Sequence, residues 1–185
     1  MRDRPVFHND SWENDTRNGL VALCGLYHRY RNPDNTKNSS FDMYSGRILD
    51  LKEKKEIGIS YFYSLLDGEL CRDISLCVVP SHIAGSRNES GIAELARRLA
   101  RNGRIDKVDY LLRIKTIDKL AYGGCRDISI QLESICVNDK MSVDGEVVLI
   151  VDDVTTSGAS LEACREILID HGASRVAMLA LGQSV

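Results

Sequence analysis

The chain has 185 residues, of which 43% are hydrophobic and 28% are charged, and its formal net charge is −3. This length and composition are typical of one globular domain with a hydrophobic core and, at most, a small appendage. The balance of charge does not indicate a strongly basic nucleic-acid-binding protein, although it is compatible with a local basic patch. Every apolar run is far shorter than the roughly 20 residues of a membrane helix, so we expect no membrane association.

Residues 1–75 show few regular patterns. The stretch GLVALCGLYHRY (19–30) suits a helix, RNPDNTKNSS (31–40) has the composition of a loop, and LKEKKEIGISYFYSLL (51–66) is ambiguous. We expect this segment to be small and irregular, forming either a hood over a site or an oligomer contact. A homodimer is therefore one arrangement that the sequence leaves open.

From residue 76 onward the pattern becomes regular. LCVVP (76–80) predicts a short buried strand stopped by proline, and SGIAELARRLARNG (90–103) predicts a helix with one apolar face. KVDYLLRI (107–114) predicts another strand. The polar stretch 115–127, which contains paired glycines, predicts a mobile loop.

The C-terminal part alternates strand and helix. EVVLIV (146–151) predicts a strand buried on both faces, a helix is expected over 159–171, and RVAMLAL (175–181) predicts the next strand. A strand, loop, helix and strand in this order form a βαβ unit. The sequence therefore predicts an α/β fold with a mostly parallel central sheet flanked by helices, with residues 76–185 as the core and residues 1–75 as a separate N-terminal segment.

The residues after the buried strand favour binding of a sugar phosphate. Asp152 and Asp153 end the apolar run, and TTSGAS (155–160) leads into the expected helix. Unpaired backbone N–H groups and the helix dipole make such a helix N-terminus a good phosphate site. Carboxylates accept hydrogen bonds from a ribose diol and also help to hold Mg²⁺. The arrangement thus suits a ribose 5-phosphate, although a strand and turn that merely cap a helix would look similar.

The stretch VVLIVDDVTTSGAS (147–160) closely resembles the phosphoribosyl pyrophosphate (PRPP) binding motif of type I phosphoribosyltransferases. Thr155 is its one departure, because the family usually has an apolar residue there. The resemblance implies the fold of that family and a reaction of PRPP with a small nitrogenous acceptor in the presence of Mg²⁺. It assigns catalysis to the acid pair and Mg²⁺ binding, direct or through water, to Asp153. It assigns PRPP binding to Asp152, Asp153, Thr155, Thr156, Ser157, Gly158, Ala159 and Ser160.

A looser resemblance to the ComF-type subfamily extends over about residues 76–185, through VVPSHIAGSRNESGIAELARRLA (78–100), DYLLRIKTIDKLAYGGCRD (109–127) and SICVND (134–139). This sequence lacks the subfamily's Gly-Phe-Asn-Gln run and its N-terminal CxxC module. The resemblance implies pyrophosphate contacts from Ser81, Arg87 and Arg126, with His82 a weaker candidate. It also implies that the loop 115–127 closes over the reacting centre, with Lys119 as a catalytic residue.

The cysteines do not indicate metal binding or disulfides. The chain has six, none in a CxxC pair, so we expect no zinc site. The N-terminus MRDRPVFHNDSWEND is polar and acidic and lacks the apolar core of a signal peptide. We therefore expect reduced thiols in a cytoplasmic protein.

Three functions remain compatible with the sequence. The first is a phosphoribosyltransferase that releases pyrophosphate. The second is a non-catalytic regulator that binds PRPP or a nucleotide, with nucleic acid as a partner if Arg97, Arg98, Arg101 and Arg104 form a basic face. The third, a scaffold with a decayed site, is least favoured because both acids and the glycine are present.

Overall fold

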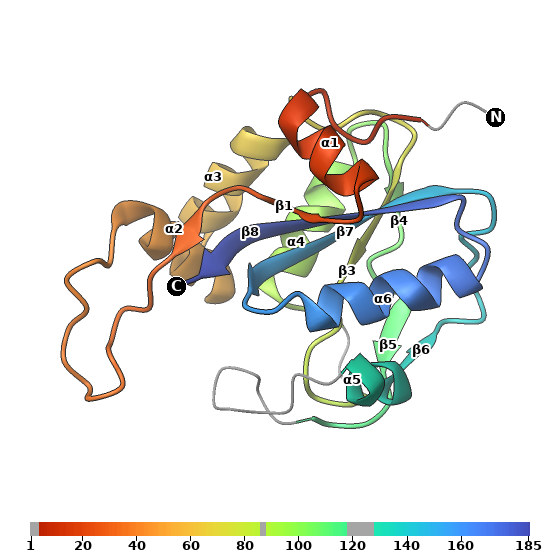
Figure 1. Ribbon diagram of the computed structural model, residues 1–185. Coiled ribbons are helices and arrows are strands. Elements are labelled where there is room, and N and C mark those ends of the chain that lie inside the picture. Colours follow the sequence, from red (N-terminus) through yellow and green to blue (C-terminus); the bar gives the residue numbers. More distant parts are fainter. Residues whose placement is uncertain (1–3, 86–87, 118–127) are drawn as a thin grey trace.

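The computed structural model describes residues 4–85, 88–117 and 128–185. A central sheet has the strand order β1-β8-β7-β3-β4, with β2 also on β8, and all its pairs are parallel (Figure 1). Its strands are β1 (Val21–Leu23), β2 (Leu26–Tyr27), β3 (Ser75–Val78), β4 (Ile105–Asp106), β7 (Val147–Thr155) and β8 (Arg175–Ser184).

Helices cover both faces of this sheet (Figure 1). One face packs against α2 (Met43–Lys52), α3 (Glu56–Leu66) and α4 (Gly91–Ala100), and α1 (Asp10–Arg17) lies beside β1. The other face packs against α6 (Ala159–Asp170). Next to α6 lie α5 (Ile128–Ser134) and a small antiparallel pair, β5 (Leu111–Arg113) and β6 (Ile135–Val137). The predicted α/β fold with a mostly parallel sheet flanked by helices is confirmed.

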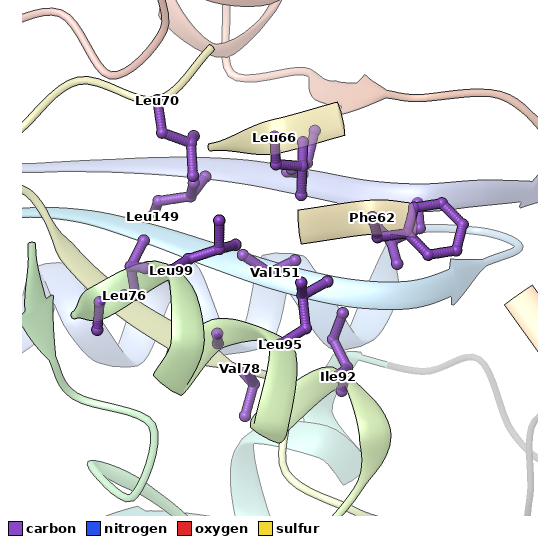
Figure 2. Close-up of a cluster of buried hydrophobic side chains, with 14 of the residues drawn as sticks. Phe62, Leu66, Leu70, Leu76, Val78, Ile92, Leu95, Leu99, Leu149 and Val151 are labelled. Carbon is purple, nitrogen blue, oxygen red and sulfur yellow. The ribbon is translucent and has the colours of Figure 1, made fainter. Parts of the chain in front are cut away.

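The central strand β7 separates two hydrophobic clusters. Leu149 and Val151 face the larger cluster, which also contains Phe62 and Leu95, whereas Ile150 faces the cluster on the α6 side. Figure 2 shows the larger cluster, with side chains from β7 meeting those of α3 and α4. Successive residues of a strand point to opposite faces, so an uninterrupted apolar run is what a doubly covered strand requires.

The predicted helices of the core have close to the predicted bounds. Ser90 caps α4 by accepting a hydrogen bond from the Ala93 amide (3.3 Å), and the predicted apolar face is buried. Helix α6 ends just before Gly172, whose φ of 91° is readily adopted only by glycine. Both β7 and β8 continue beyond the strands predicted for them.

The prediction of a helix over 19–30 is wrong. Its apolar residues form β1 and β2, which add to β8 in the registers Ala22↔Leu179 and Tyr27↔Ser184. Hydrogen bonding to an existing sheet edge outweighs the helical pattern of such a short run. The N-terminal segment is also more regular than predicted, since it contains α1, α2 and α3.

Residues of the N-terminal segment share the core of the rest of the chain. Val6, Ile48 and Phe62 belong to the same buried cluster as Leu149. The division at residue 75 stays a prediction. Among the described helices, none combines the length and hydrophobicity that crossing a bilayer requires.

We predict that Gly91→Ala destabilises the protein by about 2–4 kcal/mol, because the helices approach too closely for a side chain here. A Cβ atom on Gly91 would lie 1.7 Å from the backbone oxygen of Leu51 in α2. Urea unfolding should show the loss as a lower midpoint. Gly68→Ala is the matched control, because a Cβ atom there would have no neighbour within 4 Å. Equal midpoints for the two variants would contradict this packing.

Candidate functional site

The acid pair lies within β7 and not after it. The strand continues to Thr155, and Asp152 pairs in register with Ala180 of β8. Strand alternation sends the two carboxylates to opposite faces of the sheet. On the α2 side, the Asp153 carboxylate forms an ion pair with the Lys52 ammonium, with 3.2 Å between Oδ1 and Nζ. The strand therefore fixes both carboxylates through its backbone, while only Asp153 has a cationic partner within the described ranges.

The loop between β7 and α6 presents backbone amides at the helix N-terminus. Gly158 is in the left-handed region (φ 80°), and its N–H donates to Thr155 Oγ1 at 3.1 Å. Thr155 is thus turned inward to hold the loop, and its side chain is buried. In the part of the chain that the structure describes, the N–H groups of Ser157, Ser160 and Leu161 have no hydrogen-bond partner. Amides left open in this way are suited to an anion.

A cleft of about 740 Å³ opens beside this loop. One wall contains Asp152, Val154 and residues 155–160, which include every residue that the sequence analysis assigned to PRPP except Asp153. The opposite wall comes from the N-terminal segment: Tyr27, Arg29, Arg31, Asn32, Pro33, Asn35 and Lys52, with Ser184 from β8. None of these opposite-wall residues was predicted, because their sequence carries only the signals of a loop and a helix end.

Residues 28–40, which we call the strap, form a hydrogen-bonded wall of the cleft. An antiparallel bridge joins Arg31 to Lys37, and the Asn38 N–H donates to the Tyr30 oxygen at 3.0 Å. The start of the strap is held by the His28 N–H, which donates to Ser45 Oγ of α2 at 3.0 Å. The strap is therefore built by its own backbone and is joined to both the sheet and α2.

The two carboxylates have different electrostatic surroundings. Removal from water and, to a smaller extent, the negative charge of Asp153 raise the pKa of Asp152, Lys52 opposes both effects, and the net result is a pKa of about 7. The Lys52 ammonium also lies 5.7 Å from the centre of the Tyr27 ring. Asp152 is therefore partly protonated near neutral pH, although it borders the cleft.

The loop after β3 reaches the same edge of the sheet. Val78 pairs with Val151, so Ser81 follows β3 near the acid pair, but it does not line the cleft. Its hydroxyl accepts from the Ile83 N–H at 3.1 Å. Arg113, which the sequence analysis missed, is buried and donates from Nε to the Ser81 carbonyl at 3.0 Å. Burial lowers the pKa of this guanidinium.

The other cations assigned by the sequence differ in whether the structure describes them. Arg87, Lys119 and Arg126 lie outside the described residues, so their assigned roles stay predictions. His82 lies in the loop after β3, where its backbone oxygen accepts from the Ile117 N–H, and it does not line the cleft.

The arginines of α4 and the turn after it do not form an open basic face. Arg97 pairs with Asp109, Arg98 pairs with Glu56, and the buried Arg104 pairs with Asp67 at 2.7 Å. Arg101 remains an exposed residue of the row. Nucleic acid binding through this row is not favoured, because acids of the same chain neutralise most of its charge.

Comparisons with other proteins give likeness of fold only. No family model matches the chain, and no curated protein matches it by sequence. Among solved structures, it is similar to phosphoribosylpyrophosphate synthetase from Mycobacterium smegmatis (16% identity, 68% of this chain and 31% of that chain, TM-score 0.38). The chain thus spans about a third of that synthetase's length.

Two phosphoribosyltransferases show a similar degree of likeness. The purine phosphoribosyltransferase from Pyrococcus horikoshii is 18% identical over 88% of this chain and 79% of that chain, with a TM-score of 0.35. The hypoxanthine phosphoribosyl transferase from Trypanosoma cruzi is 12% identical over 80% and 72% respectively, with a TM-score of 0.40. Likeness at this level assigns no activity to the chain, which is defined so far as an α/β protein with open helix N-terminal amides beside an acid pair.

We predict that Asp152→Asn removes a pH-dependent loss of stability. Because the pKa of Asp152 is raised in the folded protein, protonated Asp152 contributes to the free energy of unfolding. This stability is fully present below about pH 4 and is lost as the pH rises through about 7. At pH 8 the variant should be more stable than the native protein by about 1–3 kcal/mol, and this difference should vanish near pH 4. Urea unfolding at several pH values measures it. The exposed Asp139→Asn is the control, and equal pH profiles for native protein and Asp152→Asn would refute the assigned titration.

Proposed function

We propose that the protein binds PRPP with Mg²⁺ and transfers its phosphoribosyl group to a nitrogen acceptor, releasing pyrophosphate. The observation that carries this proposal is one cleft lined by both an open set of helix N-terminal amides and Asp152. These are the groups that a 5-phosphate and a ribose diol require on neighbouring surfaces. The cleft volume is in the range of sites for small ligands of nucleotide size.

The phosphate would bind at the N-terminus of α6. The free N–H groups of Ser157, Ser160 and Leu161 would donate to its oxygens, and the exposed Thr156 hydroxyl would add another donor. Gly158 has no side chain to obstruct the approach, and its hydrogen bond to Thr155 keeps the loop in shape without the ligand. Because α6 is 12 residues long, its dipole favours an anion at this end.

The ribose would lie over the end of β7. A carboxylate at Asp152 would accept hydrogen bonds from the 2′- and 3′-hydroxyls, and Asp153 would contribute from the neighbouring position. Lys52 forms an ion pair with Asp153 and opposes the rise in the pKa of Asp152. The hydroxyls of a bound diol would donate hydrogen bonds to the Asp152 carboxylate, which is partly removed from water.

The residues also fit a magnesium ion that reaches the protein through the ligand. Within the described ranges no group of three or more histidines, cysteines and acids could hold a metal by itself. Mg²⁺ commonly binds substrate phosphates and only one or two carboxylates, often through water, and Asp152 and Asp153 are a donor set of that kind. When bound, the ion would neutralise charge on the diphosphate leaving group.

The reaction would require positioning and charge stabilisation but no covalent enzyme intermediate. The bond between ribose C1 and the diphosphate oxygen breaks, the ring acquires positive charge, and the acceptor nitrogen adds to C1 while pyrophosphate leaves with the bonding electrons. The acid pair would fix the ring and stabilise its positive charge. Ser81, Arg87 and Arg126 would contact pyrophosphate, and Lys119 would act at the reacting centre once its loop closes over it.

We predict that the native protein binds PRPP in the presence of Mg²⁺ and that Asp152→Asn with Asp153→Asn weakens this binding at least about 50-fold. The fold should survive, because both residues are held by strand pairing. Isothermal calorimetry measures the affinity, and circular dichroism verifies the fold. Asp139→Asn should bind as the native protein does.

Turnover separates the enzyme from a non-catalytic PRPP-binding protein. Pyrophosphate release is measured with a panel of nitrogen heterocycles after binding has been established. Release with one of them is expected, whereas tight PRPP binding without any release would assign a regulatory role. A native protein that does not bind PRPP would refute both.

A further inference from the structure

The wall of the cleft opposite the anion-binding loop is cationic. Tyr27, Arg29 and Arg31 all line the cleft, from the segment that leads from the end of β2 into the strap. The hydrogen bonds that fix the strap therefore also keep both arginines at the cleft. Tyr30, which lies between them, packs against Phe41 (ring centroids 5.0 Å apart).

The protein does not neutralise these two arginines with its own acids. In residues 4–85, 88–117 and 128–185, no carboxylate forms an ion pair with Arg29 or Arg31. The nearest acid in sequence, Asp34, accepts hydrogen bonds from the N–H and hydroxyl of Thr36. Arg31 donates to the Asn35 carbonyl at 2.8 Å, which orients the guanidinium but leaves its charge uncompensated.

The cleft therefore has two separate places for anionic groups. The amides at the N-terminus of α6 form one, and the strap arginines form the other across the cleft. A ligand that fills the space between them would have a phosphate at one end and a second oxyanion at the other. Arginine is well suited to the second, because its planar guanidinium binds carboxylate or phosphate with two parallel hydrogen bonds.

We infer that Arg29 and Arg31 bind a carboxylate on the acceptor, so that the substrate is an anionic nitrogen heterocycle and not a neutral nucleobase. This inference rests on the proposed function, which places phosphoribose on the α6 side of the cleft. The carboxylate takes no part in bond making or breaking. It fixes the orientation of the heterocycle, so that one ring nitrogen faces ribose C1.

The test compares product-like nucleotides that differ only in this group. Nicotinate mononucleotide is compared with nicotinamide mononucleotide, and orotidine 5′-monophosphate with uridine 5′-monophosphate, by calorimetry with the full chain. In at least one pair the carboxylated member should bind native protein about tenfold more tightly, the usual scale of one charge-assisted contact. In the Arg29→Gln, Arg31→Gln variant that ratio should fall to about one, with the affinity of the uncharged member unchanged.

Lys37→Gln is the matched control, because it removes an exposed cation of the strap that does not line the cleft. Its ratio should equal that of the native protein. If the uncharged nucleotides bind but neither pair shows a gain, or if the gain persists in the double arginine variant, the inference is wrong and the proposed function stands. If no nucleotide and no PRPP binds, the proposed function itself fails.

The same variants distinguish the acceptor from the diphosphate of PRPP as the source of the oxyanion. If the arginines hold the acceptor, PRPP affinity in the double arginine variant should stay within about twofold of the native value. A loss of PRPP affinity as large as the loss for the carboxylated nucleotide would place the diphosphate on the strap and overturn the assignment to the acceptor.

Discussion

The pairing of β7 with strands on both sides is the constraint on which the site depends. Backbone bonds to β3 and β8 hold β7 from Val147 to Thr155, and two hydrophobic clusters hold it from above and below. The acid pair is part of that strand, and the loop 156–158 continues directly from its end. The strand can therefore hold two like charges at adjacent positions. Burial of its apolar residues offsets the free-energy cost of their repulsion.

The sequence predicted the core and one wall of the cleft because both depend on local patterns. An apolar run followed by acids, small hydroxyl residues and glycine specifies a strand, a loop and a helix N-terminus within 14 neighbouring residues. The burial spacing of α2, at Ser45, Ile48 and Leu51, was present in the sequence too, but a short helix with a weakly apolar face is hard to distinguish from a loop. What could not be predicted was the addition of β1 and β2 to β8, because it depends on residues about 155 positions away.

The opposite wall of the cleft shows why local patterns were insufficient there. Arg29 lies at the end of the stretch wrongly predicted as a helix, Arg31 begins a segment with the composition of a polar loop, and Lys52 is the first residue of a charged run. Their importance comes only from position: β2 ends beside the C-terminal end of β8, and α2 ends beside Asp153. A surface charge becomes part of a binding site when the fold places it across a cleft from a complementary group, and tertiary contacts alone determine that placement.

The position of Lys52 also explains why the two adjacent acids have different electrostatic surroundings. It lies in the last turn of α2, where the helix dipole favours a cation, and it pairs with Asp153 and not with Asp152. Asp153 thereby has a cationic partner, whereas removal from water raises the pKa of Asp152 to about 7, so Asp152 is partly protonated near neutral pH. A protonated carboxyl can donate a hydrogen bond to a ribose oxygen, while an ionised one accepts from a hydroxyl. Because Lys52 lines the same cleft as Arg29 and Arg31, its ammonium is shared between the acid pair and the cationic wall of the cleft.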